Sequence, residues 1–289
     1  FRVDLNAREN YLELAERRES VLRLARLLSY NPKRNQPANG LLKFESVATT
    51  EEIFDSNNVN LAGQTVVWND PANTNWSEQF RKVLNAALPQ NGIVGKPVKS
   101  DTVNGITVQQ YRFNATNADV PVYSFTKTVD GKSTIFEVVS SDIGSGTITE
   151  EAPLPGNRLA FLYREDGKGN GSSNTGYFCS FRQGILDQGG FQITNPGSNQ
   201  VVQLDATNVN DSDVWLYRLD NNGAESQLWT KVDAVEGNNV IYNSVNKRIK
   251  NIYSVLSRVE DRVSLIFADG TFGNLPQGNF RVYYRTSQN

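Results

Sequence analysis

The sequence predicts a β-rich α+β protein, in which an N-terminal amphipathic helix and a mixed α/β segment precede antiparallel β domains. Two observations favour this class. Apolar residues recur at helical spacing within residues 6–28 and again within residues 76–88. From residue 93 onward, short apolar runs are separated by Asn-Gly and Asp-Gly pairs, which are typical of antiparallel hairpins.

Composition excludes several classes of function. The chain has 289 residues, and 29 lysines and arginines balance 31 aspartates and glutamates to a net charge of −2, which gives no electrostatic support for binding nucleic acid. Histidine is absent, which excludes Ser-His-Asp and Cys-His catalysis and imidazole metal sites. No apolar run reaches the roughly 18 residues that a membrane helix needs. We therefore expect no enzyme, no catalytic residue, no cofactor, no metal, no nucleic-acid partner and no membrane partner.

Residues 1–35 form the first predicted region, which is helical. Asn6 and Glu9 have the spacing of a capping box, and Pro32 ends the helix because the residue before a proline avoids the α conformation. The apolar positions repeat every three or four residues: Tyr11, Leu14, Ala15, Val21, Leu22, Ala25 and Leu28. Two alternatives stay open, either one continuous helix or a break after which Ser20 caps a second helix.

This helix either packs on its own domain or joins a bundle with helices of other chains. Its apolar arc is wide enough to contact two neighbours, which favours the bundle. The arc consists of Leu22, Leu24, Ala25, Leu27 and Leu28. The residues that we expect to make the bundle contact are Leu14, Val21, Leu24 and Leu28.

Residues 36–100 form the predicted mixed α/β segment. Alternating apolar residues predict strands at 41–49 and 64–68. A second amphipathic helix is predicted over residues 76–88, and Pro89 ends it.

Residues 101–250 form the predicted β-rich insertion region. Asn104-Gly105 and Asp130-Gly131 each separate two apolar runs, and both pairs are typical of tight hairpin turns. Residues 140–158 are rich in serine, glycine, glutamate and proline, which predicts a junction. Residues 166–174 are predicted to form a flexible hairpin tip because glycine recurs in them.

Residues 251–289 form the last predicted region, which is also β-structured and ends in a strand at 279–285. We expect the strand near residues 42–47 to pair with the late strands at 263–285, so that the middle of the chain is an insertion. The single cysteine, Cys179, excludes an internal disulfide, and no histidine can activate it. We expect it to be a buried structural thiol.

Two stretches carry a resemblance to a known family. The first runs from Arg17 to Pro32 and continues to Pro37-Ala38. The second is Phe267–Gly273, followed by a proline, a glycine and the strand at 280–285. Both resemble the baseplate J-like proteins of contractile-tailed phages and related injection machines. Val67–Asp70 and Trp76–Phe80 are also similar to the ring-forming baseplate wedge subunits of T-even-type phages.

The late motif has a physical interpretation of its own as a structural turn. Its members are Phe267, Asp269, Gly270, Phe272, Gly273, Pro276 and Gly278. The Asp-Gly pair fits a turn that needs positive φ, the later glycines permit sharp bends, and the proline fixes one. We expect the two phenylalanines to pack on the two sides of the turn. None of these side chains offers chemistry to a substrate, which favours a scaffold.

The resemblance implies a structural virion protein, a baseplate wedge subunit that forms the inner ring of a contractile tail and relays the conformational change that triggers sheath contraction. The implied partners are a second copy of the chain, a wedge protein that adds a helix to the N-terminal bundle, neighbouring wedges, and sheath-initiator and hub proteins. The implied location is the tail baseplate of the virion, after assembly in the host cytoplasm. Compared with the family, residues 251–289 are expected to lack a closing C-terminal part.

Two alternative functions remain. The equivalent ring subunit of a phage-derived injection machine fits the late motif equally well. A carbohydrate-binding or carbohydrate-cleaving tail protein is the other, because two carboxylates suffice for a glycosidase and tryptophans can stack on sugars. The acid pairs are Glu150-Glu151, Glu165-Asp166 and Glu260-Asp261, and the tryptophans are Trp68, Trp76, Trp215 and Trp229.

Overall fold

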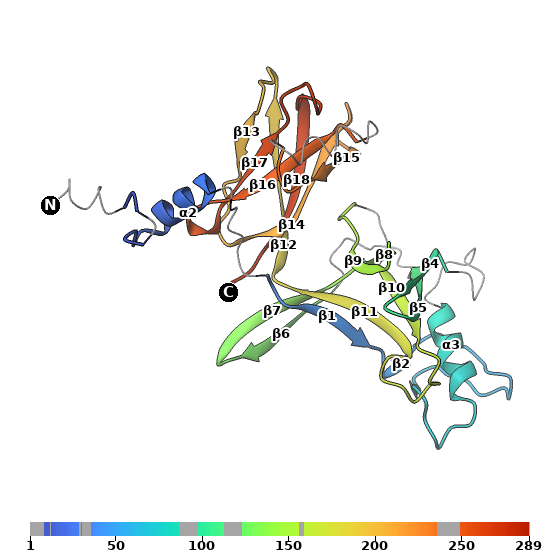
Figure 1. The fold of residues 1–289 in the computed structure, drawn as a ribbon. Coiled ribbons are helices and arrows are strands. Elements are labelled where there is room, and N and C mark those ends of the chain that lie inside the picture. Colours follow the sequence, from blue (N-terminus) through green and yellow to red (C-terminus); the bar gives the residue numbers. More distant parts are fainter. Residues whose placement is uncertain are drawn as a thin grey trace. The chain divides into compact units, whose positions relative to one another are not determined.

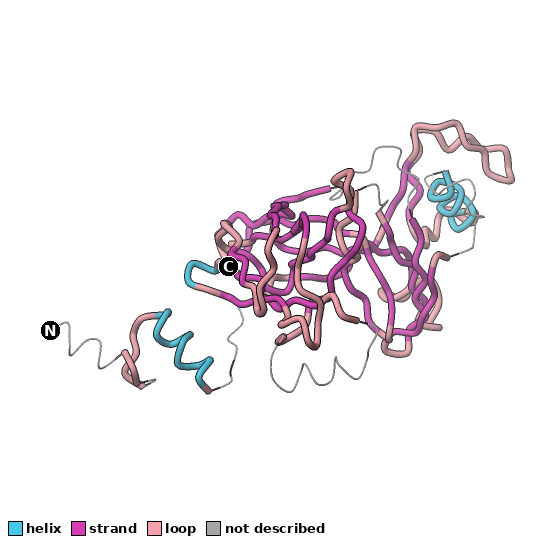
Figure 2. Tube along the Cα trace, turned by 90° about the horizontal axis from the view of Figure 1, so that it is seen from above, coloured by secondary structure: helices cyan, strands magenta, loops and turns pink. Residues whose placement is uncertain are grey.

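The structure is a computed structural model, and it describes residues 9–11, 13–28, 30, 36–86, 97–112, 123–155, 159–235 and 249–288. The fold is β-rich α+β, as predicted, and strands dominate the trace (Figures 1 and 2). The chain divides into two compact units. We call Ala38–Gln183 the inserted unit, and we call Phe1–Pro37 together with Gly184–Asn289 the split unit.

The unit boundary at Gln183 lies inside the region 101–250 that the sequence groups together. The inserted unit contains, in order, β1 (Asn39–Lys43), β2 (Ser46–Ala48), β3 (Thr65–Val67), α3 (Trp76–Ala86), β4 (Lys99–Val103), β5 (Ile106–Arg112), β6 (Tyr123–Val129), β7 (Lys132–Val139), β8 (Ser141–Gly144), β9 (Thr147–Glu150), β10 (Ala160–Glu165) and β11 (Gly176–Gln183). The helix predicted at 76–88 is therefore present as α3, while residues 87–88 and Pro89 lie outside the described residues.

The main sheet of the inserted unit has the order β4-β5-β10-β11-β7-β6, and β1 pairs with β11. All of these pairs are antiparallel. The predicted pairing of the 42–47 strand with the late strands is wrong, because Leu42 lies opposite Cys179. An apolar alternation makes a strand without specifying its partner, and the partner here lies far along the chain.

An aromatic cluster joins α3 to this sheet. The rings of Trp76 and Phe80 lie 4.7 and 5.2 Å from that of Trp68, and the Tyr177 ring of β11 lies 5.8 Å from it. Edge-to-face pairs of this kind stabilise the fold beyond the contribution of the area that the rings bury. Trp68 is only 8% exposed and Phe80 is fully buried, so the apolar face of α3 is a core face.

Asp55 fixes the loop before β3 to the start of α3. One carboxylate oxygen accepts hydrogen bonds from the backbone N–H groups of Asn57 and Val59, and the other accepts from the side-chain amides of Asn75 and Gln79. The Gln79 hydrogen bond first, and then the others, lower the pKa of Asp55 to about 2.

The turns confirm some predictions and correct others. Asn104-Gly105 and Asp130-Gly131 have positive φ at both positions, as a type I′ hairpin turn requires. Residues 140–158, predicted as a junction, contain the β8–β9 hairpin, and residues 156–158 lie outside the described residues. The predicted flexible tip at 166–174 is tied together by Asp166, whose carboxylate accepts hydrogen bonds from Lys168 N–H and from the Ser172 and Thr175 hydroxyls.

The split unit contains the second helix and the second large sheet. Its elements are α2 (Arg18–Leu27), β12 (Ile185–Ile193), β13 (Val201–Gln203), β14 (Val209–Leu219), β15 (Glu225–Lys231), β16 (Ile252–Ser257), the 3₁₀ turn η1 (Val259–Asp261), β17 (Val263–Phe267) and β18 (Gly278–Thr286). The strand order is β12-β18-β14-β15-β16-β17-β13. Only the β15–β16 pair is parallel among the described strands, and it covers two residue pairs.

The core of the split unit includes residues of β14, β17 and β18. Leu216, Leu265, Phe267 and Val282 are fully buried there, and the Trp229 ring lies 5.5 Å from the ring of Phe267. β18, the last strand, pairs with both β12 and β14 and therefore lies inside the sheet.

Candidate functional site

The N-terminal helix begins later than the continuous alternative predicts. α2 starts at Arg18, so the chain takes the alternative with a break, although the start lies two residues before Ser20. The Glu9 carboxylate accepts hydrogen bonds from the backbone N–H groups of Glu16 and Arg17, at the N-terminal end of α2. These hydrogen bonds and one from the Ser20 hydroxyl, which is the largest cause, lower the pKa of Glu9. Asn6 and Pro32, the predicted cap and stop, lie outside the described residues.

This role of Glu9 was not predicted from the sequence, where Glu9 was placed in a capping box at the start of a longer helix. The available signal was Glu9 itself, because a carboxylate is attracted to free N–H groups at any helix N-terminus. The separation of Glu9 from Ser20 in the sequence does not indicate that the two side chains meet. They meet because the chain turns at Leu14–Ala15.

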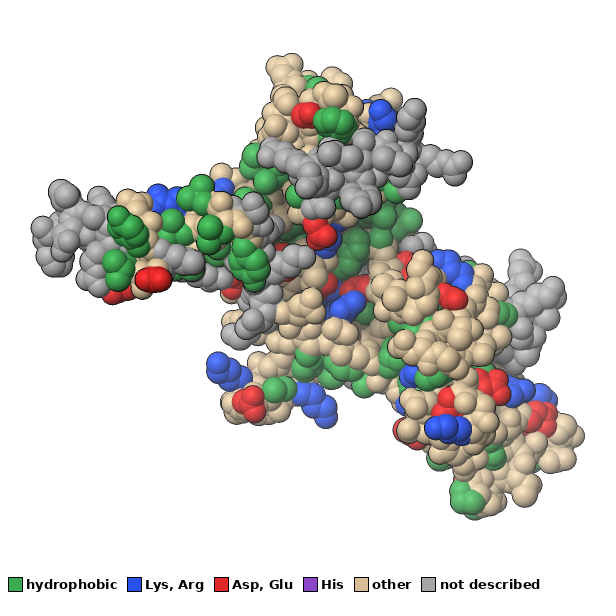
Figure 3. Space-filling view, in the orientation of Figure 1, with side chains coloured by type: hydrophobic (Ala, Val, Ile, Leu, Met, Phe, Trp, Pro, Cys, Tyr) green, Lys and Arg blue, Asp and Glu red, His purple; other side chains and the backbone are tan. Residues whose placement is uncertain are grey.

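The predicted apolar stripe extends over α2 and the residues on both sides of it. Leu28, directly after α2, is 69% exposed, and Leu14, four residues before it, is 45% exposed. Val21 and Leu24, which lie within α2, are half-buried. Hydrophobic side chains gather along this helix in the space-filling view (Figure 3). Isolated helices of about ten residues are marginal in water, so a stripe of this kind gains most from a packing partner.

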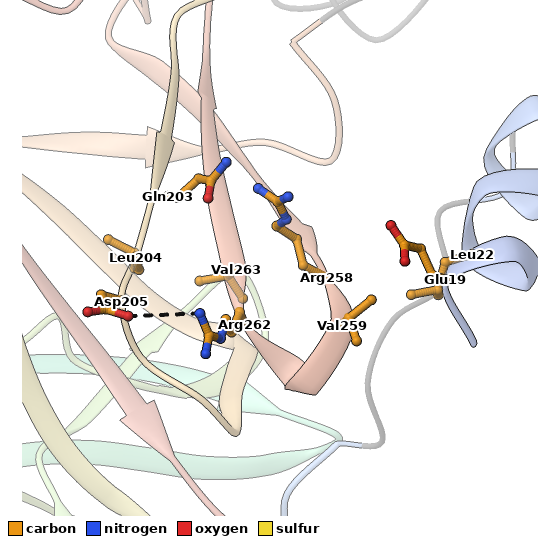
Figure 4. Close-up of a pocket in the computed structure, with 9 residues that line it drawn as sticks. All are labelled: Glu19, Leu22, Gln203, Leu204, Asp205, Arg258, Val259, Arg262 and Val263. Atoms are coloured by element: carbon orange, nitrogen blue, oxygen red, sulfur yellow. Dashed lines mark ion pairs between the residues drawn. The ribbon is translucent and has the colours of Figure 1, made fainter. Parts of the chain in front are cut away.

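A second side of α2 borders a cavity. Glu19 and Leu22 line a space of about 590 Å³ together with residues of the β13 end and of the η1–β17 segment (Figure 4). The charged groups on the far wall are Arg258, Arg262 and Asp205, and the Arg262 guanidinium lies 3.9 Å from the Asp205 carboxylate. Leu22, a member of the predicted apolar arc of this helix, therefore lines this cavity together with Glu19.

The late motif forms a turn, but its two phenylalanines differ. Phe267 is fully buried and contacts the Phe280 ring at 6.1 Å, whereas Phe272 is 43% exposed. The expectation that both pack against the turn holds for Phe267 alone. The Asp269 carboxylate accepts hydrogen bonds from the N–H groups of Phe272 and Thr271, which lower the pKa of Asp269.

The glycines and the proline of the motif have separate roles. Gly270 has φ +90° and Gly278 has φ +110°, values that side chains rarely adopt. Gly273 has no such positive φ, but a Cβ at this position would lie 2.6 Å from the Ala268 Cβ and 2.9 Å from Ile252. Pro276 is buried beside the turn's exit. All of these features serve the backbone.

The groups with the most chemical potential are already engaged. Burial raises the pKa of the Cys179 thiol to about 11, so it is protonated at neutral pH. The carboxylate of Glu150 lies 3.4 Å from Arg182, and that of Glu151 forms a two-point ion pair with Arg112. Within the described ranges, no three acidic or cysteine side chains are placed to hold a metal ion.

Two of the four tryptophans are core residues. Trp68 is 8% exposed in the core of the inserted unit, and Trp229 is 4% exposed in the core of the split unit. Neither described helix is long and apolar enough to cross a membrane.

Comparison with known proteins adds one match. No curated protein matches the sequence. A family model described as "Domain of unknown function (DUF8360)" matches residues 40–289, which include all but the first two residues of the inserted unit, β12 to β18 and the late motif, but not α2. Because this match covers most of the chain, the protein belongs to the DUF8360 family.

Proposed function

We propose that the protein is a structural subunit of a contractile-tail baseplate, a wedge protein that assembles into the inner ring and relays the change that triggers sheath contraction. Its activity is assembly, and its partners are a second copy, a wedge protein that adds a helix to α2, and neighbouring wedges, with sheath-initiator and hub proteins beyond them.

The observation that carries the proposal is the exposed apolar stripe of α2. Leu28, directly after α2, is 69% exposed, and Leu24 of α2 is half-buried, so this side of the segment is suited to packing against another helix. Support also comes from the two motif stretches that resemble baseplate J-like proteins. The late motif fits this reading, because its described residues shape a turn and leave no reactive group there.

The test is co-expression with the wedge proteins of the same source, using the double substitution Leu24→Asp and Leu28→Asp. Two carboxylates in the apolar stripe must be desolvated when a helix packs on it, so wedge assembly is expected to fall at least tenfold. Pull-down yield and the mass of the complex by light scattering measure this loss.

The matched control is Arg23→Asp, which changes the net charge by the same two units at an exposed position of α2 outside the apolar stripe. It is expected to leave wedge assembly close to wild type. Circular dichroism of both variants should keep the β signal, because α2 contributes none of the strands. Normal wedge assembly by the Leu24/Leu28 variant would refute the proposed bundle.

The carbohydrate alternative has no contact in its favour among the described residues, since two tryptophans are core residues and the Glu150 and Glu151 carboxylates are paired. Glycan-array binding or turnover of host polysaccharide by the wild-type chain would nevertheless support it over assembly. An injection-machine ring subunit would give the same result as the phage protein in the co-expression test.

A further inference from the structure

The β6–β7 hairpin extends beyond its sheet as a two-stranded arm. β6 and β7 pair along residues 123–139, but β11 pairs with β7 only at residues 136–139 (Figure 1). We call residues 126–135 the arm. Thr134 alone in the arm is half-buried, and the other nine residues are exposed, including Val129 at 46% and Ile135 at 40%. Both faces of the arm are therefore open, and two strands alone are marginally stable in water.

The outer edge of β6 has an assignable set of hydrogen-bonding groups. Asp130 and Gly131 form a two-residue turn with φ of 49° and 77°, so the flanking pair Val129–Lys132 exchanges both of its backbone hydrogen bonds. Alternation along an antiparallel pair then directs the N–H and C=O groups of every second residue outward. The outward residues of β6 are Ser124, Thr126 and Thr128, all three exposed.

This edge carries no strand from the described residues, since β6 is terminal in the strand order. We propose that β6 pairs with β6 of a second copy of this chain, antiparallel, about a two-fold axis at Thr126. The two arms then form one four-stranded sheet, in the order β7-β6-β6-β7. The proposed function names a second copy as a partner, and this inference assigns a surface to that contact, but it is argued from β6 alone and does not depend on α2.

Self-complementarity of the strand favours a second copy as the occupant. With Thr126 on the axis, all seven residues of β6 are paired, and Ser124 lies opposite Thr128 of the other copy. Lys127 lies opposite Phe125, so the ammonium group meets an aromatic ring instead of a like charge. An axis at Lys127 would place two lysines directly opposite each other, which is unfavourable.

Phe125 is held in a suitable position for this contact. Its ring stacks on Phe136 of β7 at 5.4 Å and lies edge-on to Phe181 of β11 at 6.3 Å. The face of β6 that carries Phe125 and Lys127 is thus anchored to the sheet at one end. A lysine on an edge strand normally discourages pairing. With the axis at Thr126, the two copies of Lys127 are not opposite each other, and the full length of β6 is still paired.

The expected association is weak. One pair of seven-residue strands is smaller than the roughly 1,200–2,000 Å² of a stable interface, so dimers form only at high concentration or beside other contacts. Cysteine cross-linking detects such pairs well, because opposed residues in a hydrogen-bonded antiparallel pair have Cα atoms about 5.5 Å apart, within disulfide range. The native Cys179 is buried and does not compete.

The first test uses the full chain with Thr126→Cys under mild oxidation. We expect disulfide-linked dimers at a level at least tenfold above Ser133→Cys, an exposed control in β7, which is one strand further from the proposed axis. A second test mixes Ser124→Cys with Thr128→Cys chains. The mixture should cross-link, whereas each variant alone should form no disulfide-linked dimer, because each cysteine then lies opposite a serine or a threonine.

Equal cross-linking of Thr126→Cys and Ser133→Cys, or cross-linking of Ser124→Cys with itself, would overturn the proposal. Thr126→Pro gives an independent test, because proline is tolerated where an edge-strand N–H faces outward. With an unchanged circular dichroism spectrum, it should abolish concentration-dependent dimers in sedimentation, while Thr126→Ala retains them. The Leu24/Leu28 variant should dimerise through β6 normally, so the two proposals fail separately.

Discussion

At the scale of single residues, one motif holds two side chains of the same type with different roles. Phe267 lies at the centre of the aromatic core with Trp229, Phe280 and Phe191, whereas Phe272 lies on the surface of the turn. Their spacing in the sequence does not distinguish them. The difference arises because Phe267 closes strand β17, where side chains alternate into the core, while Phe272 follows the turn.

The two phenylalanines should therefore differ in stability effects. Phe267→Ala is expected to destabilise the split unit by about 3–5 kcal/mol, because it removes a fully buried ring from a packed core. Phe272→Ala should lower the free energy of unfolding by less than about 1 kcal/mol. Hydrogen exchange of the β18 amides, read against urea concentration, measures both. Comparable losses for the two variants would contradict the assignment of Phe272 to the surface.

At the scale of elements, local signals were predictable and partners were not. The Asn-Gly and Asp-Gly hairpins were found because a type I′ turn is specified by two residues. α3 was found from its apolar period. The β1–β11 pair joins segments more than a hundred residues apart, and the residue pattern of neither strand identifies the other as its partner. The Ser145-Gly146 turn was missed because serine seldom adopts the positive φ it has here.

The exposed stripe of α2 was predictable in the same local way, since it depends on spacing within one helix. Its start was not, because Glu9 reaches the N-terminus of the helix only after the chain turns at Leu14. The exposed β6–β7 arm could not be predicted from the sequence either, because it depends on how many residues of β7 pair with β11.

The connection between Asp55 and α3 should depend on pH. Asp55 has a pKa of about 2 in the folded protein, below the 3.8 of an unperturbed carboxyl group. Its stabilising contribution is therefore complete above about pH 4 and is lost as the pH falls towards 2. Asp55→Asn should lower the melting temperature of the inserted unit at pH 6, and this difference should shrink between pH 4 and pH 2.

Intrinsic fluorescence of Trp68 and Trp76, which pack beside this loop, reports the transition. Asp130→Asn is a suitable control, because Asp130 lies exposed in the β6–β7 turn. A pH-independent difference between wild type and Asp55→Asn would show that the four hydrogen bonds do not favour the ionised carboxylate.

At the scale of the whole molecule, the inserted unit has its two ends side by side. The backbone N–H of Gln183 donates to the Ala38 carbonyl at 2.8 Å, and the Ala38 N–H donates to the Gln183 side chain at 3.0 Å. A unit closed in this way can be separated from the chain without cutting an internal strand.

Residues 38–183 should therefore fold alone. We expect a cooperative thermal transition and the dispersed amide spectrum of a structured β domain, because all the strand partners of β1 to β11 lie within this range. The control is residues 38–175, which lack β11, the strand that pairs with β1, β7 and β10. This shorter fragment should aggregate or remain unfolded. A molten 38–183 fragment would show that the unit depends on the remainder of the chain.

The position of β18 has a consequence for the order of events on the ribosome. The inserted unit has all its strands once Gln183 has left the exit tunnel, so it can fold while synthesis continues. The split unit cannot, because β18 is the strand that joins β12 to β14 among the described residues, and it is complete only when Thr286 has been translated. For about a hundred codons, the nascent chain thus presents one finished domain followed by strands with unfilled edges, and chaperone capture is expected to concentrate in that interval.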